Sequence, residues 1–320
     1  MTRHSGGHAG GLEQGSVLGG SKTTPALSCS QYRHDTSLAY QRVASGGKVI
    51  ETACGPIQYA EFGDGAPILI VHGSGGGYDQ GEYFARLIGG GYRWIAPSRF
   101  GFLGTPAPEG ANSSLQADAY ACLLDSLGID RVGVVGVSMG GPSALLFAHR
   151  YQQRTKSLAL ISAASHAIPP RGLILATPFK IFLNDRVFWS MVHLTPEGLL
   201  AALGVPGDVQ RELPPRDMAR LSAFLKSIQP MGARKQGQLL EQVMSEVDAD
   251  QIHAIHVPAL VLHARDDTLV PFEHGEFAAR SISGARLVPM EKGGHLALMI
   301  DLNAGARGKL LAFLQQHNSS

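Results

Sequence analysis

The chain has 320 residues, of which 44% are hydrophobic and 17% charged, and its formal net charge is +1. This length and apolar content predict a large core, in one big domain or in a domain with an insertion. A charge so close to zero argues against nucleic acid as a partner. No uncharged apolar stretch reaches the length of about 18 residues that would span a membrane. We therefore expect small neutral partners, and the composition leaves a homodimer open.

The beginning of the chain differs in composition from the rest. Residues 1–24 are rich in Gly, Ser and His and poor in apolar residues, which is typical of a flexible arm. They lack the basic segment and following apolar segment of a secretory signal. We expect residues 1–45 to form a flexible N-terminal arm.

The three cysteines, Cys29, Cys54 and Cys122, are an odd number without a Cys-x-x-Cys spacing. This argues against a zinc site and against a disulfide framework. We expect free thiols in a reducing compartment, hence a cytoplasmic location, with Cys122 as a small buried side chain on a helix.

From residue 57 onward, short apolar runs alternate with longer amphipathic ones. The short runs predict strands over 57–63, 67–73, 93–98, 131–138 and 157–164. The amphipathic runs predict helices over 79–89, 113–129 and 139–152. Strands and helices that alternate in this way form a mostly parallel sheet with helices on both faces.

The alternation stops at residue 166. Residues 166–251 contain only helical pieces, separated by many prolines, and we expect a helical cap inserted between two strands. A strand over 256–267, a helix over about 272–282, a strand over 285–291 and a helix over 295–316 follow. The core therefore comprises residues 46–165 and 252–320, and the cap would cover the carboxyl edge of its sheet, where α/β proteins bind ligands.

The glycine-rich turn VHGSGGGYDQ, residues 71–80, follows the second predicted strand. Such a turn either binds a phosphate group or holds a backbone N–H against an oxyanion. The G-x-G-x-x-G fingerprint fails because Tyr78 occupies the position of its last glycine, and the lysine of a Walker loop is missing. Arg99, which could meet a 2′-phosphate, keeps the phosphate interpretation open, but the oxyanion interpretation is favoured.

The sequence GVSMG, residues 136–140, matches G-x-S-x-G between a predicted strand and a predicted helix. This is the context of a nucleophile elbow, in which Ser138 adopts a strained backbone conformation that exposes its Oγ. Gly136, Gly140 and Gly141 would let neighbouring backbone pass close by. The alternative is a glycine-rich turn with an exposed serine.

A serine hydroxyl becomes a nucleophile when a base takes its proton, and an imidazole base needs a carboxylate to fix its tautomer. Candidates for both follow Ser138 in the chain. Asp266 and Asp267 end a predicted strand, and His295 follows two glycines just before the last helix.

The chain resembles the serine-nucleophile α/β-hydrolases of the cap-bearing esterase, lipase and cofactor-free haloperoxidase type, over residues 50–318. The motifs that carry the resemblance are in the family's order, and they are VHGSGG, SRFGFLGTP, GVSMGG, HARDDTLVP and GGH. The resemblance implies an α/β-hydrolase fold: a mostly parallel central sheet, flanking helices and an inserted helical cap. It also implies that the reaction needs neither a cofactor nor a metal.

The resemblance assigns roles to individual residues. Ser138 would be the nucleophile, His295 the base, and Asp267, four residues before a proline, the acid. Asp266 would then form the turn or pair with an arginine. The backbone N–H groups of Ser74 and Met139 would form the oxyanion hole.

Two further expectations concern residues near this site. His72 is expected to brace its loop, not to catalyse. The sequence SRFG has Ser98 where the family often has aspartate, so one structural carboxylate is missing.

These assignments predict a serine hydrolase that cleaves a carboxylic ester through an acyl-enzyme, with a small-molecule ester as its substrate. Apolar cap residues favour a hydrophobic acyl or alcohol group, although they would equally well pack the cap on the core. A C–C bond hydrolase is the alternative, because HGSGGG is similar to the loop of meta-cleavage-product hydrolases; a lactonase would use the same triad. Outside the enzyme class, the alternative is a non-catalytic ligand-binding protein of this fold, which retained binding without turnover would identify.

Overall fold

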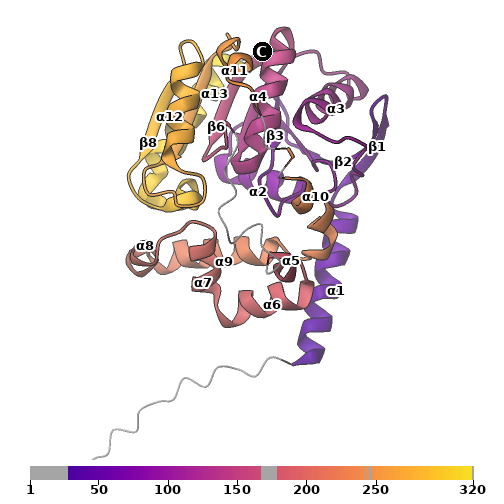
Figure 1. Ribbon diagram of the computed structural model, residues 1–320, viewed down its shortest axis with the longest axis vertical. Helices are drawn as coiled ribbons and strands as arrows, with labels where there is room; N and C mark the ends of the chain where they lie inside the picture. The colour runs from indigo at the N-terminus through magenta and orange to yellow at the C-terminus, as the bar shows by residue number, and fades with distance from the viewer. Residues whose placement is uncertain (1–27, 167–178, 242, 245–246, 319–320) are drawn as a thin grey trace, which may run out of the picture.

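The computed structural model describes residues 28–166, 179–241, 243–244 and 247–318. An eight-stranded sheet forms its centre, in the order β1-β2-β4-β3-β5-β6-β7-β8 (Figure 1). The strands are β1 (Lys48–Thr52), β2 (Gly55–Phe62), β3 (Ala66–Val71), β4 (Tyr92–Pro97), β5 (Val132–Val137), β6 (Thr155–Ile161), β7 (Ala259–Ala264) and β8 (Arg286–Met290). Strand β2 pairs antiparallel with β1 and β4, and all other neighbours are parallel, which confirms the mostly parallel sheet.

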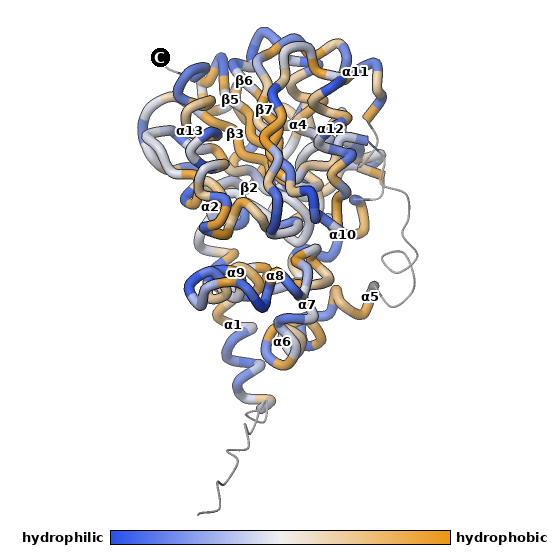
Figure 2. The backbone as a smooth tube through the Cα atoms, turned by 90° about the vertical axis from the view of Figure 1, so that its left-hand side faces the viewer, coloured by the Kyte–Doolittle hydropathy of each residue, from blue (hydrophilic) through white to orange (hydrophobic). Residues whose placement is uncertain are grey.

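Helices cover both faces of this sheet. On one face lie α2 (Tyr78–Ile88) and α13 (Ala304–Asn318). On the other lie α3 (Ser113–Ser126), α4 (Gly141–Arg150), α11 (Ala249–His253) and α12 (Phe272–Ser281). Alternate residues of the central strands enter the two buried clusters, so the strands are apolar throughout (Figure 2). No helix of the described residues is long and apolar enough to cross a membrane.

The chain forms a layer of short helices after β6 and before β7, and this layer lies beyond one edge of the sheet (Figure 1). It contains α5 (Phe179–Phe182), α6 (Asp185–Leu194), α7 (Pro196–Ala202), α8 (Gly207–Glu212) and α9 (Pro215–Ser227). Helix α10 (Lys235–Leu240) then returns toward the sheet. Phe188, Leu221 and Phe224 join the apolar cluster of the α2 face, so these helices share a core with the sheet. Helix α11 packs on α4 and α12, outside this layer.

Helix α1 (Cys29–Ser45) occupies part of the predicted flexible arm, and that prediction was wrong for these residues. Ser28 caps the helix by accepting a hydrogen bond from the Gln31 N–H at 3.0 Å. Ala39 and Val43 are buried on its inner side. The prediction failed because it extended the composition of residues 1–24 to a segment with its own apolar face; residues 1–27 lie outside the described part.

The prediction of three free thiols was also wrong. Cys54, in the turn between β1 and β2, forms a disulfide with Cys122 of α3, and Cys29 is the exposed free cysteine. The two partners are 68 residues apart in sequence, and the fold places their Cα atoms 5.9 Å apart. Sequence spacing alone could not indicate this proximity. The cytoplasmic location, which depended on free thiols, stays a prediction.

The end of the chain differs from the predicted helix over residues 295–316. Two 3₁₀ turns, η4 (Gly294–Met299) and η5 (Asp301–Asn303), come before α13. Gly294 has a φ of +59°, and the His295 N–H donates to the Gly204 carbonyl at 2.9 Å. The chain therefore turns at His295 and does not begin a long helix there.

Candidate active site

Ser138 lies in a sharp turn between β5 and α4. Its φ is +51°, the strained conformation that the sequence predicts for a nucleophile elbow. A Cβ on Gly140 would lie 2.5 Å from the Val71 carbonyl oxygen, and one on Gly141 would lie 2.3 Å from that of Ala164. Both positions therefore require glycine so that β3 and the loop after β6 can approach the turn.

The structure brings Ser138, His295 and Asp267 together from three separate loops. His295 Nε2 lies 2.8 Å from Ser138 Oγ, and His295 Nδ1 lies 2.8 Å from Asp267 Oδ2. Because a carboxylate only accepts hydrogen bonds, Nδ1 carries the proton and Nε2 accepts from the serine hydroxyl. All three residues are buried, so water competes little for these contacts.

Asp267 is held as a carboxylate. Its Oδ1 accepts hydrogen bonds from the Leu269 and Val270 N–H groups, both at 2.9 Å. Burial on its own would raise the pKa of Asp267, but His295 and His263 outweigh it and hold the pKa well below the usual carboxyl range. Asp267 is therefore ionised at neutral pH and able to stabilise a positive charge on His295.

Asp266, the neighbouring carboxylate, binds the turn that carries His295. Its Oδ2 and Oδ1 accept hydrogen bonds from the Gly293 and Gly294 N–H groups, both at 2.9 Å. The sequence predicts that Asp266 forms the turn or pairs with an arginine, and these hydrogen bonds agree with turn formation. Asp266 thus fixes the position of His295 through the backbone.

His263 is a neighbour of Asp267 that sequence reasoning did not identify. It is fully buried on β7, and its Nε2 donates to the Val270 carbonyl at 2.8 Å. The same nitrogen lies 3.4 Å from Asp267 Oδ2. The sequence did not single out its role because its position, inside a strand, is typical of an ordinary core residue.

The glycine-rich turn after β3 approaches Ser138 closely. A Cβ on Gly73 would lie 2.8 Å from the Ser138 Cβ, and the Gly73 N–H donates to Gln80 Oε1 at 2.8 Å. Among the described residues, none accepts a hydrogen bond from the Ser74 N–H. Met139, the second residue of the 3₁₀ turn η1 (Ser138–Gly140), has an N–H without a partner inside that turn.

Side chains from the segment after α9 hold this turn in place. Glu241 accepts a hydrogen bond from the Ser74 hydroxyl and pairs with the buried Arg99. Gln238 Oε1 accepts a hydrogen bond from the Gly75 N–H at 2.6 Å. More than 160 residues separate these partners from the turn in sequence, and no motif indicated them.

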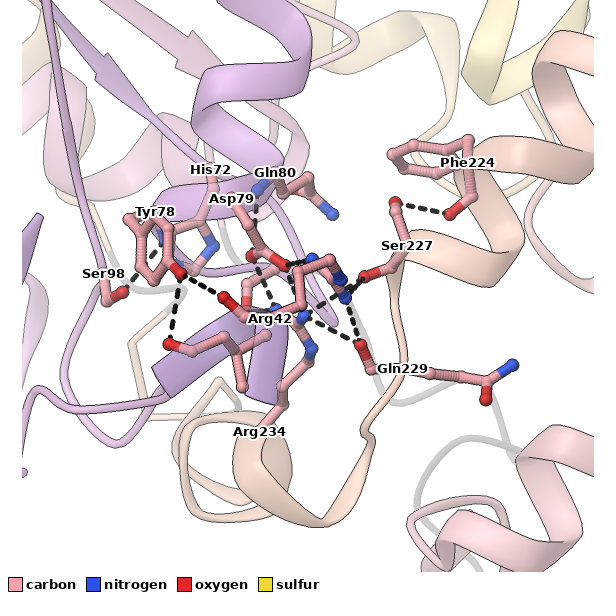
Figure 3. A network of polar contacts seen from close by, with 12 residues as sticks. Arg42, His72, Tyr78, Asp79, Gln80, Ser98, Phe224, Ser227, Gln229 and Arg234 are labelled. Carbon is pink, nitrogen blue, oxygen red and sulfur yellow. Dashed lines mark hydrogen bonds and ion pairs between the residues drawn. The ribbon is translucent and has the colours of Figure 1, made fainter. Parts of the chain in front are cut away.

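A second polar cluster fixes the start of α2, just after the turn (Figure 3). Asp79 accepts two hydrogen bonds from the fully buried Arg234, at 2.7 and 3.0 Å, and one from Arg42 of α1 at 2.6 Å. Arg234 also donates to the Gly76 carbonyl at 2.7 Å. Burial would raise the pKa of Asp79, but the two arginines lower it to about 2.

His72 braces the loop, as the sequence predicts. Its Nδ1 donates to the Gly73 carbonyl at 2.8 Å, and its Nε2 accepts from the Arg99 N–H at 2.9 Å. Burial and the Arg99 charge hold the pKa of His72 well below its usual value, so the ring is neutral. Arg99 is itself buried against Glu241, and this pairing argues against the 2′-phosphate interpretation. Ser98, in place of the usual aspartate, accepts a hydrogen bond from the Tyr78 N–H.

A small cavity of about 40 Å³ adjoins Ser138. Its polar lining includes Ser74, Gln80, Ser162 and His295. The remaining side chains of its lining are apolar, and they are Phe84, Val137, Ile161, Leu203, Phe224, Ile228, Leu269, Leu296 and Leu298. Among the described residues that line it, none carries a fixed charge.

Several apolar and histidine side chains between β6 and β7 do not line this cavity. Phe188, Trp189 and Leu225 are buried in packing contacts, and Met191 faces a different groove. His166 stacks on His274, and His193 contacts Trp189. Among the described residues from 179 to 241, Leu203, Phe224 and Ile228 line the cavity, and residues 167–178 lie outside the described part.

Comparison with known proteins agrees with this geometry. A family model described as alpha/beta hydrolase fold matches residues 66–302. The chain is 30% identical to an uncharacterized hydrolase, YcgS, of Bacillus subtilis, over 82% of this chain and 95% of that protein. It is also 30% identical to 2-hydroxy-6-oxo-6-phenylhexa-2,4-dienoate hydrolase of Comamonas testosteroni, over 75% of this chain and 85% of that protein.

A solved structure is similar along its whole length. The alpha/beta hydrolase fold protein from Nakamurella multipartita superposes with a TM-score of 0.73 at 30% identity, over 84% of this chain and 99% of that one. The family match extends well beyond half of the chain and includes Ser138, Asp267 and His295. The protein is a hydrolase that belongs to the alpha/beta-hydrolase fold family.

Proposed function

We propose that the protein hydrolyses carboxylic esters through an acyl-enzyme intermediate on Ser138. The observation that carries this proposal is the continuous hydrogen-bonded chain from Asp267 through His295 to Ser138. In it, His295 Nε2 takes the proton from Ser138 Oγ as this oxygen attacks the ester carbonyl carbon. Asp267 orients the ring and stabilises the imidazolium that forms.

The same groups complete the acylation step and then carry out deacylation. His295 gives its proton to the oxygen of the departing alcohol, and the acyl group remains on Ser138. A water molecule then loses a proton to His295 Nε2 and attacks the acyl carbon. The carboxylic acid leaves when His295 returns the proton to Ser138.

The backbone N–H groups of Ser74 and Met139 would stabilise the oxyanion of each tetrahedral intermediate. Two observations support this assignment: no residue in the described ranges accepts a hydrogen bond from the Ser74 N–H, and the Met139 N–H lies in the turn η1. Donors of this kind contribute roughly 3–4 kcal/mol each in comparable sites. The side chains around Ser74, Gly75 and Gly76 keep the turn fixed, so little reorganisation is needed when charge develops.

The chemistry of the cavity favours a neutral, apolar ester over an anionic substrate. A dienoate, the substrate class in the name of the Comamonas relative, carries a carboxylate. Among the described residues, the cavity offers no arginine or lysine to bind one. Leu203, Phe224 and Ile228, from the segment between β6 and β7 in the chain, form part of the apolar wall of this cavity.

Carbon–carbon bond hydrolysis is the second candidate, favoured by the identity to the dienoate hydrolase. Initial rates on p-nitrophenyl esters of increasing acyl length, beside a 2-hydroxy-6-oxo-dienoate, separate the two. We expect turnover of the esters, little turnover of the dienoate, and loss of both with Ser138→Ala. Turnover of the dienoate alone would overturn the proposal. Binding of esters without turnover in the wild type would indicate a ligand-binding protein.

A further inference from the structure

Ser162, at the end of β6, has two unusual properties. Its φ is +45°, a conformation that favours glycine and that a serine adopts only when its surroundings hold it. Its side chain is also buried: Ser162 is 2% exposed, and its Oγ has no hydrogen-bond partner among the described residues. A buried hydroxyl without a partner destabilises the folded protein, so its presence needs an explanation.

Neighbouring backbone contacts hold Ser162 in this conformation. Its N–H donates to the Leu262 carbonyl on β7 at 2.8 Å. Two residues later, the Ala164 N–H donates to the Ser138 carbonyl at 3.0 Å. The strand end that carries Ser162 is therefore fixed both to the sheet and to the nucleophile turn.

A purely structural role does not account for the hydroxyl. Glycine at this position would relieve the backbone strain, and alanine would avoid burying a polar atom. Buried serines nearby have partners: Ser157 Oγ accepts from Asn318 at 2.8 Å, and Ser165 Oγ donates to the His274 carbonyl at 2.8 Å. Ser162 belongs to the lining of the cavity that also contains Ser138 and His295, so a substrate bound there is close enough to supply the missing partner.

We infer that the Ser162 hydroxyl is a specificity determinant that hydrogen-bonds a neutral oxygen function of the substrate, close to the scissile ester. This inference rests on the proposed ester hydrolysis and names its substrate class: an otherwise apolar ester that carries a hydroxyl or a carbonyl a few bonds from the reacting carbon. The partner is neutral because no lining residue among those described carries a fixed charge. In apolar surroundings, one such hydroxyl discriminates between substrates with and without the matching group.

The test compares matched substrate pairs by kcat/KM. For the acyl side, the pair is p-nitrophenyl 3-hydroxybutyrate and p-nitrophenyl butyrate. For the alcohol side, the pair is 2-hydroxyethyl butyrate and propyl butyrate, and the rate is measured from the butyric acid that is released. We expect the wild type to prefer the oxygenated member of one pair by about tenfold or more, and the pair that responds identifies the side of the ester.

Two variants and a control assign the preference to the hydroxyl. Ser162→Ala keeps the Cβ and Ser162→Gly accepts the positive φ, so at least one is expected to fold; in both, the ratio should fall to about one. For each variant, the ratio divides its kcat/KM on the oxygenated ester by its kcat/KM on the matched ester without that oxygen. A general loss of activity affects both values and therefore cancels. Ser157→Ala, on β6 and away from the cavity, should keep the wild-type ratio.

The outcomes separate this inference from the proposed function. A wild-type ratio near one for both pairs, or an unchanged ratio in Ser162→Gly, overturns the role of Ser162 and leaves ester hydrolysis intact. Absence of turnover on every ester overturns both.

Discussion

The two adjacent carboxylates, Asp266 and Asp267, offer a matched test of the candidate site. Asp267 contacts the His295 ring, whereas Asp266 contacts the backbone ahead of it. We expect Asp267→Asn to lower kcat on an ester by roughly 10³–10⁴-fold, because an amide no longer stabilises the imidazolium or its tautomer. Asp266→Asn keeps one acceptor oxygen, and we expect a loss of roughly tenfold.

Steady-state kinetics, with circular dichroism to verify folding, distinguishes the two variants. KM should change little in Asp267→Asn, since the carboxylate does not line the cavity. An Asp266→Asn variant as inactive as Asp267→Asn would mean that the acid has been assigned to the wrong residue.

At the scale of elements, the segment from Arg234 to Glu241 supports the turn that carries Ser74. Glu241 of this segment pairs with Arg99, and their side chains are 11% and 1% exposed. Glu241→Gln keeps an acceptor for the Ser74 hydroxyl but leaves the Arg99 charge buried without its partner. We expect the free energy of unfolding to fall by about 3 kcal/mol.

Denaturant unfolding measures this loss, and an exposed pair provides the control. The control is Glu291→Gln, because Glu291 is 75% exposed beside Arg265. This substitution should change the free energy of unfolding by less than about 0.5 kcal/mol. Equal effects of the two substitutions would show that Arg99 does not depend on Glu241.

The predictions from sequence succeeded where a local pattern fixes the structure. The strand, turn and helix around Ser138 are consecutive in the chain, and each apolar run is a short local pattern. The hydrophobic period and the turn residues are therefore enough to predict these elements. Glu241, Gln238 and Arg234 reach the same site from more than 150 residues away. Their contacts arise from tertiary packing, which no short pattern encodes. Strand β1 was missed because its residues are largely exposed.

At the scale of the whole molecule, the Cys54–Cys122 disulfide connects the β1–β2 turn to α3, and the loop that it closes contains β2, β3 and β4. A bridge that closes a loop of this length stabilises a fold by about 2–4 kcal/mol, chiefly by restricting the unfolded chain. We expect Cys54→Ser to lower the free energy of unfolding by this amount. A reductant should lower the unfolding midpoint of the wild type and leave that of the variant unchanged. Cys29→Ser, at the exposed thiol, is the control and should behave as the wild type.

Asp79 joins three parts of the molecule, since it belongs to α2 and binds Arg42 of α1 and Arg234 beside α10 (Figure 3). Its pKa is about 2, compared with an ordinary value of 3.8. The folded state therefore favours the ionised form, and the resulting stabilisation is fully present above the pKa of the unfolded chain. It is lost as the pH falls from about 4 toward 2, because protons then bind the unfolded state first.

The difference between the two pKa values corresponds to roughly 2 kcal/mol at neutral pH. Asp79→Asn should lose at least this much there, because it also leaves the fully buried Arg234 without its carboxylate. Unfolding by urea at stepped pH values checks the sign: the gap between wild type and variant should narrow as the pH falls below about 4. Asp125→Asn, at a 65% exposed carboxylate beside Arg154, provides a control that should follow the wild-type curve. A gap that stays constant down to pH 3 would mean that Asp79 does not link acid stability to the contact between α1, α2 and the segment at Arg234.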